Sequence, residues 1–269
     1  MLETLFDQSA GQIVPLPKSL EALYGGPFRL PERVVFANFV STIDGIVSFN
    51  VPGQDQAKQV SRGYAGDRFM LALLRGVADA VIVGAGTLRK ERGSIWTAEA
   101  VYPQNAVDFA SVRAALGRPS RPLTIIVTAS GEVDLAAPVF TDGGPVIIAT
   151  TSAGAARLVE RPPHVQVRVL AEAAPIRSAD LVRLAVGESG GARILTEGGP
   201  SLFGAFLADH AVDELFLTIA PQIAGRSRDA RRTGLVEASA FLPDDAPRAT
   251  LSSVKRSEDY LFTRFAFGG

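Results

Sequence analysis

The order of apolar segments along the chain is the feature that most restricts its fold. Between these segments, apolar residues recur at helical spacing, as in residues 69–77 and 179–188. Strands that alternate with helices predict an α/β fold with a mainly parallel central sheet flanked by helices. The runs typical of buried strands lie at residues 34–40, 80–83, 123–128, 146–150, 165–170 and 213–221.

The two ends of the chain depart from this alternation. Residues 250–255 and 260–267 resemble two strands joined by a turn, which predicts an antiparallel hairpin at the C-terminal end of the sheet. Residues 1–30 are rich in proline and glycine, so we expect an arm with one short helix near residues 19–23. The arm would lie over a single domain of residues 31–269.

Three further segments complete the prediction of structure. Residues 50–66 are expected to be a loop, and residues 93–120 to be an irregular excursion with a short helix near residues 109–116. A further helix is predicted at residues 153–160. Either the arm or the irregular excursion could cover a binding pocket.

Composition excludes several classes of protein. With 269 residues, 47% of them hydrophobic, the chain can bury one substantial core. The formal net charge is -1 and no basic stripe is interleaved with aromatic residues, so we expect no nucleic-acid partner. The absence of cysteine excludes disulfides and thiolate sites and is consistent with the cytoplasm. No apolar run reaches membrane-spanning length, so we expect a soluble protein with no membrane partner.

A strand end, a glycine pair and a helix start follow one another in residues 193–204. The glycines at 198–199 allow a sharp turn and a close approach of a ligand to the backbone. Pro200 suits the first position of a helix, where its missing N–H is no loss. We expect the amides of Ser201 and Leu202 to point unpaired at an anion such as a diphosphate. An ordinary connection between a strand and a helix is the alternative interpretation.

Polar side chains follow several predicted strands, at the sheet edge where open parallel sheets bind ligands. They are Asp44, Thr87, Thr128 and Glu197. Glu197 is the strongest candidate for a site carboxylate, with a structural role in the turn as the alternative. A second glycine turn, at residues 84–87, lacks the third glycine and the acidic partner of a Rossmann fingerprint. Two such turns could still hold two parts of one extended cofactor.

The remaining polar clusters favour structural roles. His164 and His210, the only histidines, have no serine motif beside them, so no catalytic triad is predicted. No carboxylate spacing fits a calcium loop, and no metal site is expected. Four arginines follow the strand at residues 213–221, and we favour a solvent-exposed loop over a phosphate clamp there. They are Arg226, Arg228, Arg231 and Arg232.

Assembled in this order, the segments resemble the reductase domain of the bacterial riboflavin-biosynthesis deaminase-reductase, a family with a dihydrofolate-reductase-like fold. The resemblance covers roughly residues 33–267. It rests on residues 38–45 (NFVSTIDG), on Arg75 with residues 78–87 (ADAVIVGAGT), and on residues 196–202 (TEGGPSL) followed by Val-Asp-Glu-Leu at 212–215.

The resemblance implies an NADPH-dependent oxidoreductase, a pyrimidine reductase of riboflavin biosynthesis. Hydride would pass to the ribose C1′ imine of 5-amino-6-(5-phosphoribosylamino)uracil. Asn38, Arg75 and Glu197 would bind the substrate, with Asp44 and Glu197 as catalytic residues. The family also implies a cytoplasmic homodimer that acts on a small molecule. The residues implied to bind NADPH are Ser41, Val83, Gly84, Thr87, Glu91, Thr128, Gly198, Gly199, Pro200, Ser201, Leu202 and Phe203.

The chain departs from the family pattern mainly on the substrate side. The family usually has a lysine at the position of Asn38, an aspartate at that of Glu91, and Trp-Ile-Thr where this chain has residues 61–63. Three alternatives therefore stay open: a reductase of dihydrofolate or another pterin-like substrate, a deazaflavin-dependent reductase, and a non-catalytic nucleotide-binding relative. No deaminase zinc motif is present, so no deamination is expected.

Overall fold

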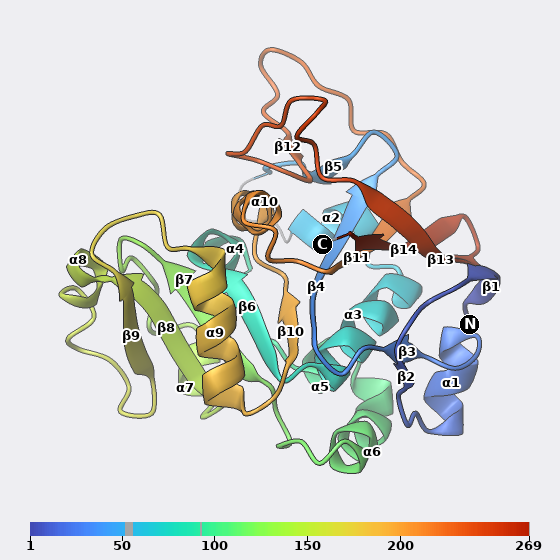
Figure 1. Ribbon diagram of the computed structural model, residues 1–269, viewed down its shortest axis with the longest axis horizontal. Helices are drawn as coiled ribbons and strands as arrows, with labels where there is room; N and C mark the ends of the chain where they lie inside the picture. The colour runs from blue at the N-terminus through green and yellow to red at the C-terminus, as the bar shows by residue number, and fades with distance from the viewer. Residues whose placement is uncertain (52–55, 92, 269) are drawn as a thin grey trace.

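A ten-stranded sheet forms the centre of the protein, in the order β1-β13-β14-β11-β4-β10-β6-β7-β8-β9 (Figure 1). The computed structural model describes residues 1–51, 56–91 and 93–268. From β11 to β9 all neighbouring strands run parallel, so the predicted α/β fold with a mainly parallel sheet is confirmed. The parallel strands are β4 (Val34–Thr42), β6 (Ala80–Gly84), β7 (Leu123–Thr128), β8 (Val146–Thr151), β9 (Gln166–Ala171), β10 (Arg193–Thr196) and β11 (Glu214–Ala220).

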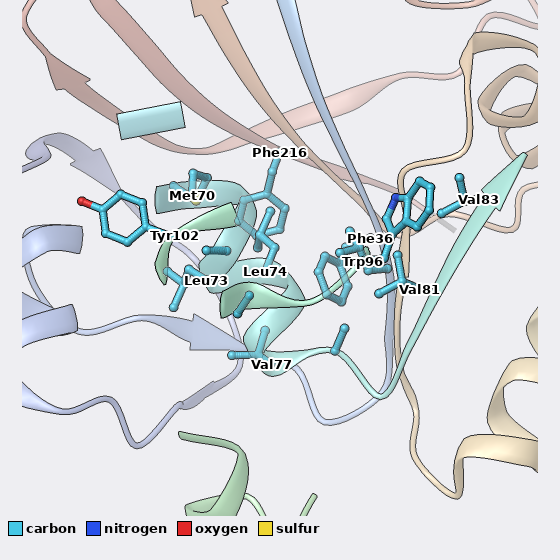
Figure 2. Packing of buried hydrophobic residues seen from close by; sticks show 14 of the residues in the cluster. Phe36, Met70, Leu73, Leu74, Val77, Val81, Val83, Trp96, Tyr102 and Phe216 are labelled. Atoms are coloured by element: carbon cyan, nitrogen blue, oxygen red, sulfur yellow. The ribbon is translucent and has the colours of Figure 1, made fainter. Parts of the chain in front are cut away.

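Helices cover both faces of this sheet, so neighbouring residues of one strand enter different cores. Val81 of β6 packs in the cluster drawn in Figure 2, together with the apolar face of α3 (Ala65–Val77). Ile82 belongs to the second cluster, with α9 (Ser178–Ser189) and α10 (Pro200–Ala208). Burial on both faces explains why the inner parallel strands, such as β6 and β8, are continuous apolar runs.

The C-terminal end of the sheet is antiparallel. β13 (Ala249–Ser257) and β14 (Tyr260–Phe267) form the predicted hairpin. β1 (Glu3–Asp7) adds an outer strand by pairing with β13, so the N-terminal arm joins the sheet as well as lying over it. The ammonium of Lys255, only 2% exposed, donates to the hydroxyl of Thr4 at 2.5 Å and strengthens this attachment.

The structure differs from prediction in three segments. Residues 56–61 of the expected loop form a helix, while residues 52–55 lie outside the described ones. Residues 93–120 are not irregular throughout, because the expected short helix extends over Ala106–Ala115 and Trp96 is fully buried. The helix predicted at residues 153–160 ends after Ala155, because Gly154 has a low helix propensity.

The remaining elements are short. None of the helices within the described ranges has the length and apolar character of a membrane span. Nor do the described residues contain a cluster of histidines and carboxylates that could hold a metal ion. These elements are α1 (Lys18–Tyr24), the predicted short helix, then β2 (Gln12–Ile13), β3 (Arg29–Leu30), β5 (Ile46–Ser48), α2 (Gln56–Ser61), α4 (Ala85–Lys90), α5 (Ala98–Val101), η1 (Pro103–Asn105), α6 (Ala106–Ala115), α7 (Pro138–Thr141), α8 (Ser152–Ala155) and β12 (Thr233–Gly234).

Candidate functional site

A cavity of about 1130 Å³ opens at the carboxyl ends of β10, β6 and β7. Further parts of its wall come from α3, α4, and residues 47–51 and 229–233. Small-molecule pockets usually have volumes of about 300–1,000 Å³. This cavity therefore has room for an extended cofactor together with a small substrate.

Most of the predicted site residues line this cavity, although they come from elements far apart in the sequence. Among the described residues, none from 1–30 or 93–120 belongs to the wall, so neither segment covers the cavity. The predicted residues that line it are Asn38, Arg75, Gly84, Thr87, Glu91, Thr128, Glu197, Gly199, Pro200, Ser201 and Leu202.

The other predicted residues lie behind or outside the wall. Val83 and Phe203 are buried in the hydrophobic cores on the two faces of the sheet. Gly198 is buried because the side chain of Leu202 occupies the space that a Cβ would need. The predicted residues that do not line the cavity are Ser41, Asp44, Val83, Gly198 and Phe203.

Arg75 and Glu197 meet at the cavity wall. Nε of Arg75 donates to Oε1 of Glu197 at 2.7 Å, and Nη2 donates to Oε2 at 2.6 Å. Nη1 donates to the carbonyl of Ile95 at 3.3 Å. The side chains are only 3% and 9% exposed, and a two-pronged pair of this kind fixes both groups in one plane. Because Glu197 balances its charge, Arg75 is a weaker ligand for phosphate than an unpaired guanidinium would be.

The two predicted glycine turns contact one another. The amide of Gly199 donates to the hydroxyl of Thr87 at 3.0 Å, and a Cβ on Gly199 would lie 3.0 Å from the same oxygen. Pro200 opens α10, as predicted. The expectation that the amide of Leu202 is unpaired is wrong, because this amide donates to the carbonyl of Gly199 at 2.9 Å. The amide of Ser201 has no acceptor among the described residues, so it is the group at this helix start that can meet an anion.

Asp44 lies in the turn after β4, outside the cavity wall. Its carboxylate accepts from the hydroxyl of Thr42 at 2.6 Å and from the amides of Ala224 and Gly225 at 3.0 and 2.8 Å. These hydrogen bonds, that from Thr42 foremost, lower the pKa of Asp44 to about 2. The geometry therefore assigns Asp44 to the attachment of this turn to the loop after β11.

Several residues of the wall were not predicted. Asp67 and Leu71 line the cavity with Arg75, at a spacing of four residues that puts all three on one face of α3. This spacing can be read from the sequence, because Asp67 and Leu71 precede Arg75, which was already a candidate, by eight and four residues. Arg89 and Lys90 also line the cavity, and their place after the second glycine turn is the sequence signal that could have indicated them.

A chain of hydrogen bonds joins α4 to residues 229–233 at the wall. Lys90 donates from its ammonium to Oδ1 of Asn50 at 3.0 Å. The side-chain amide nitrogen of Asn50, Nδ2, donates to the carbonyl of Arg231 at 3.0 Å and to the hydroxyl of Thr233 at 2.8 Å. The arginine-rich loop, for which we favoured exposure to solvent, therefore also forms part of the cavity wall.

Comparison with known proteins places this geometry in a family context. A sequence profile described as the RibD C-terminal domain matches residues 33–260. No curated protein sequence matches the chain. Among solved structures, a pyrimidine reductase-like protein from Corynebacterium diphtheriae has a TM-score of 0.65 at 24% identity, over 93% of this chain and 99% of that one.

Two further solved structures are similar to this chain over only part of their own length. The diaminohydroxyphosphoribosylaminopyrimidine deaminase/5-amino-6-(5-phosphoribosylamino)uracil reductase from Thermotoga maritima has a TM-score of 0.62 at 22% identity, over 88% of this chain and 57% of that one. RibD from Acinetobacter baumannii has a TM-score of 0.65 at 17% identity, over 88% of this chain and 59% of that one. The chain thus spans about three-fifths of these two proteins. At such identities the similarity shows a shared fold.

Proposed function

The chain belongs to the RibD C-terminal domain family, and from that membership we propose that it is an NADPH-dependent reductase that transfers hydride to the carbon of a C=N bond. Its fold is the dihydrofolate-reductase-like fold of the riboflavin-biosynthesis pyrimidine reductases. The leading substrate is 5-amino-6-(5-phosphoribosylamino)uracil, the compound in the name of the Thermotoga relative. Hydride would reach C1′ of its open-chain ribose imine.

One observation carries the proposal: both glycine turns and the Arg75–Glu197 pair line a single cavity. The free amide of Ser201, beside the hydroxyl of Thr87, suits the diphosphate of a dinucleotide. The absence of a Cβ at Gly199 keeps this part of the wall open to a ligand. A bound reduced nicotinamide would supply the hydride, and the protein would supply position and charge.

The Arg75–Glu197 pair would hold the substrate. Three of the five N–H groups of Arg75 are used by Glu197 and Ile95, so others remain for a ligand. Each carboxylate oxygen of Glu197 also keeps lone pairs that can accept from N–H groups of a pyrimidine or pterin ring. Most of the rate enhancement would come from holding the C=N carbon against the hydride donor, with a smaller part from proton transfer.

A pterin substrate such as dihydrofolate is the second candidate. Glu197 neutralises Arg75, and Asn38, whose amide donates to the carbonyl of Phe216 at 3.4 Å, brings no charge to the cavity. The part of the wall that these three residues form suits the N–H groups of a ring better than it suits a phosphate. We also propose that the protein is a homodimer, which light scattering of the purified chain tests.

The decisive experiment traces the hydride. The purified protein is given NADPH deuterated at the donating nicotinamide carbon, together with either candidate substrate. We expect NADPH absorbance to fall and the product to gain one deuterium at C1′ of the ribose chain, or on the pterin ring if dihydrofolate is the substrate. If turnover occurs only with a reduced deazaflavin, the deazaflavin replaces NADPH as the proposed hydride donor. Binding of NADPH without turnover of either substrate would indicate a non-catalytic relative.

A further inference from the structure

Two segments far apart in the sequence form a strap along one side of the cavity. The strap consists of residues 46–50 and 229–234, and both segments supply residues of the cavity wall. Within it β5 and β12 pair antiparallel, and Figure 1 shows these two strands side by side, outside the ten-stranded sheet and next to α10.

The strap is fastened at the side of α10. The guanidinium of Arg232 lies 5.0 Å from the centre of the Phe49 ring, and its Nη1 donates to the carbonyl of Phe49 at 2.6 Å, which joins the two segments. The amide of Gly234 donates to Oε1 of Glu237 at 2.8 Å. The amide of Glu237 in turn donates to the carbonyl of Pro200 at 3.2 Å, at the start of α10. Several contacts therefore hold this side of the strap.

The side of the strap that faces α4 is held differently. The ammonium of Lys90 donates to Oδ1 of Asn50 at 3.0 Å, and this contact is exposed to solvent. Within the described ranges it is the one side-chain hydrogen bond between α4 and the strap. An exposed hydrogen bond contributes little net free energy, because water can replace either partner. The contact of Lys90 with Asn50 is therefore the place where the strap separates from α4 most readily.

Asn50 holds the strap in position for this contact. Its Nδ2 bonds to Arg231 and Thr233 connect the two segments of the strap, and the hydroxyl of Ser48 donates to its Oδ1 at 3.0 Å. The backbone of Asn50 has a φ of 54°, in the left-handed region that asparagine adopts more readily than most residues. Together these features fix Oδ1 where the ammonium of Lys90 reaches it.

The cavity lies between the strap and α4, and the Lys90–Asn50 contact joins these two walls on the solvent side. A ligand as long as a dinucleotide passes between the walls when they separate. Resting on the proposed function, we infer that the Lys90–Asn50 contact is a latch that opens for NADPH to enter and leave, with Asn50 as a positioning residue. Neither residue is among those that we propose to contact NADPH. Loss of the latch should therefore affect the free and the bound protein alike, and change the rates of binding more than the Kd.

Stopped-flow measurement of NADPH binding tests the latch, with the fluorescence of the nicotinamide as the signal. Lys90→Met removes the ammonium and keeps the length of the side chain. We expect the association and dissociation rate constants both to rise about three- to tenfold, with the Kd changed less than about twofold. Asn50→Gly removes every side-chain contact and tolerates the positive φ, so both rate constants should rise at least as much. Lys90→Arg keeps a charged donor and should stay close to the wild type.

Amide hydrogen exchange of the protein without added NADPH gives a second measurement. In Lys90→Met the amides of the strap should exchange about three- to tenfold faster, while those of β6 and β7 keep the wild-type rates. Lys18→Met is the matched control, because Lys18 is an exposed lysine of α1 outside the cavity wall. It should change neither the rate constants nor the exchange, and thermal melts should show that every variant is folded.

The outcomes separate the latch from the proposed function. Unchanged rate constants in Lys90→Met overturn the inference, whether or not the strap exchanges faster. A rise in the dissociation rate constant alone, with the Kd rising in step, also overturns it and assigns Lys90 to direct contact with NADPH. A wild type that binds no NADPH overturns the proposed function. The exchange measurement then decides on the latch alone: faster exchange of the strap in Lys90→Met supports it, and unchanged exchange overturns it.

Discussion

Arg75 and Glu197 form one unit at the cavity wall, with Nε–Oε1 at 2.7 Å and Nη2–Oε2 at 2.6 Å. The sequence indicates both residues as substrate ligands, and the structure adds that each fixes the other. Loss of one partner leaves a nearly buried charge without compensation, which is strongly destabilising. Their role in stability and their proposed role in substrate binding must therefore be measured separately.

Glu197→Gln keeps the shape of the side chain and removes its charge. We expect turnover to fall roughly 10²-fold, because the substrate loses its orientation. The Kd of NADPH should change less than about threefold, since we propose that Thr87, Gly199 and Ser201 form the cofactor side. Steady-state kinetics and a titration with NADPH measure the two effects. A Kd that rises in step with the loss of turnover would place Glu197 on the cofactor side instead.

A double-mutant cycle over Arg75→Met and Glu197→Met measures the pair itself. Each single variant is expected to lower the free energy of unfolding by about 3–5 kcal/mol, because the remaining charge is left almost without water. The double variant should lose clearly less than the sum, since it leaves no orphaned charge. Urea denaturation gives the three values. Simple additivity would show that the two groups are not coupled.

Thr87→Val removes the hydroxyl that joins the two glycine turns and keeps the side-chain volume. The amide of Gly199 then has no acceptor, which should lower the free energy of unfolding by about 1–3 kcal/mol. The Kd of NADPH should rise about tenfold, because the turn beside Ser201 loses its support. Thr87→Ser keeps the hydroxyl and is the matched control. The prediction fails if valine and serine behave alike in denaturation and in the titration.

The inner parallel strands were predicted well because burial on both faces leaves little choice of residue. The run at 123–128 coincides with β7, and the run at 34–40 lies within β4, both almost wholly buried. β1 (Glu3–Asp7) was missed for the opposite reason: it is an edge strand with mostly exposed side chains, so no apolar period marks it. Only its pairing with β13 makes it a strand.

The site was predicted in its backbone more than in its side chains. Glycine turns and the helix start at Pro200 are local features, and local sequence specifies them. The contact of Asn50 with Lys90 depends on how distant segments pack. The same holds for Asp44, whose partners Ala224 and Gly225 follow it by about 180 positions. A sequence motif shows that Asp44 ends a strand, and only the fold shows that its carboxylate is already occupied.

The occupied carboxylate of Asp44 predicts a pH dependence. Its pKa is lowered from 3.8 to about 2 in the folded protein, by the hydrogen bond from Thr42 foremost and by the two backbone amides. A group with a lowered pKa stabilises the folded state above its unfolded value, and that stabilisation is lost as the pH falls toward the folded value. The wild type should therefore melt higher than Asp44→Asn near pH 6, and the difference should shrink between about pH 4 and pH 2. Thermal melts of both proteins across this range measure it.

Asp244→Asn is the control, because it changes an exposed carboxylate for which no side-chain partner is found in the described residues. It should give a small difference in melting temperature that does not vary with pH in the same way. A constant gap between wild type and Asp44→Asn would mean that the hydrogen bonds hold the turn equally well without the charge. A fall in turnover for Asp44→Asn at a pH where it is fully folded would instead return Asp44 to the chemistry of the cavity.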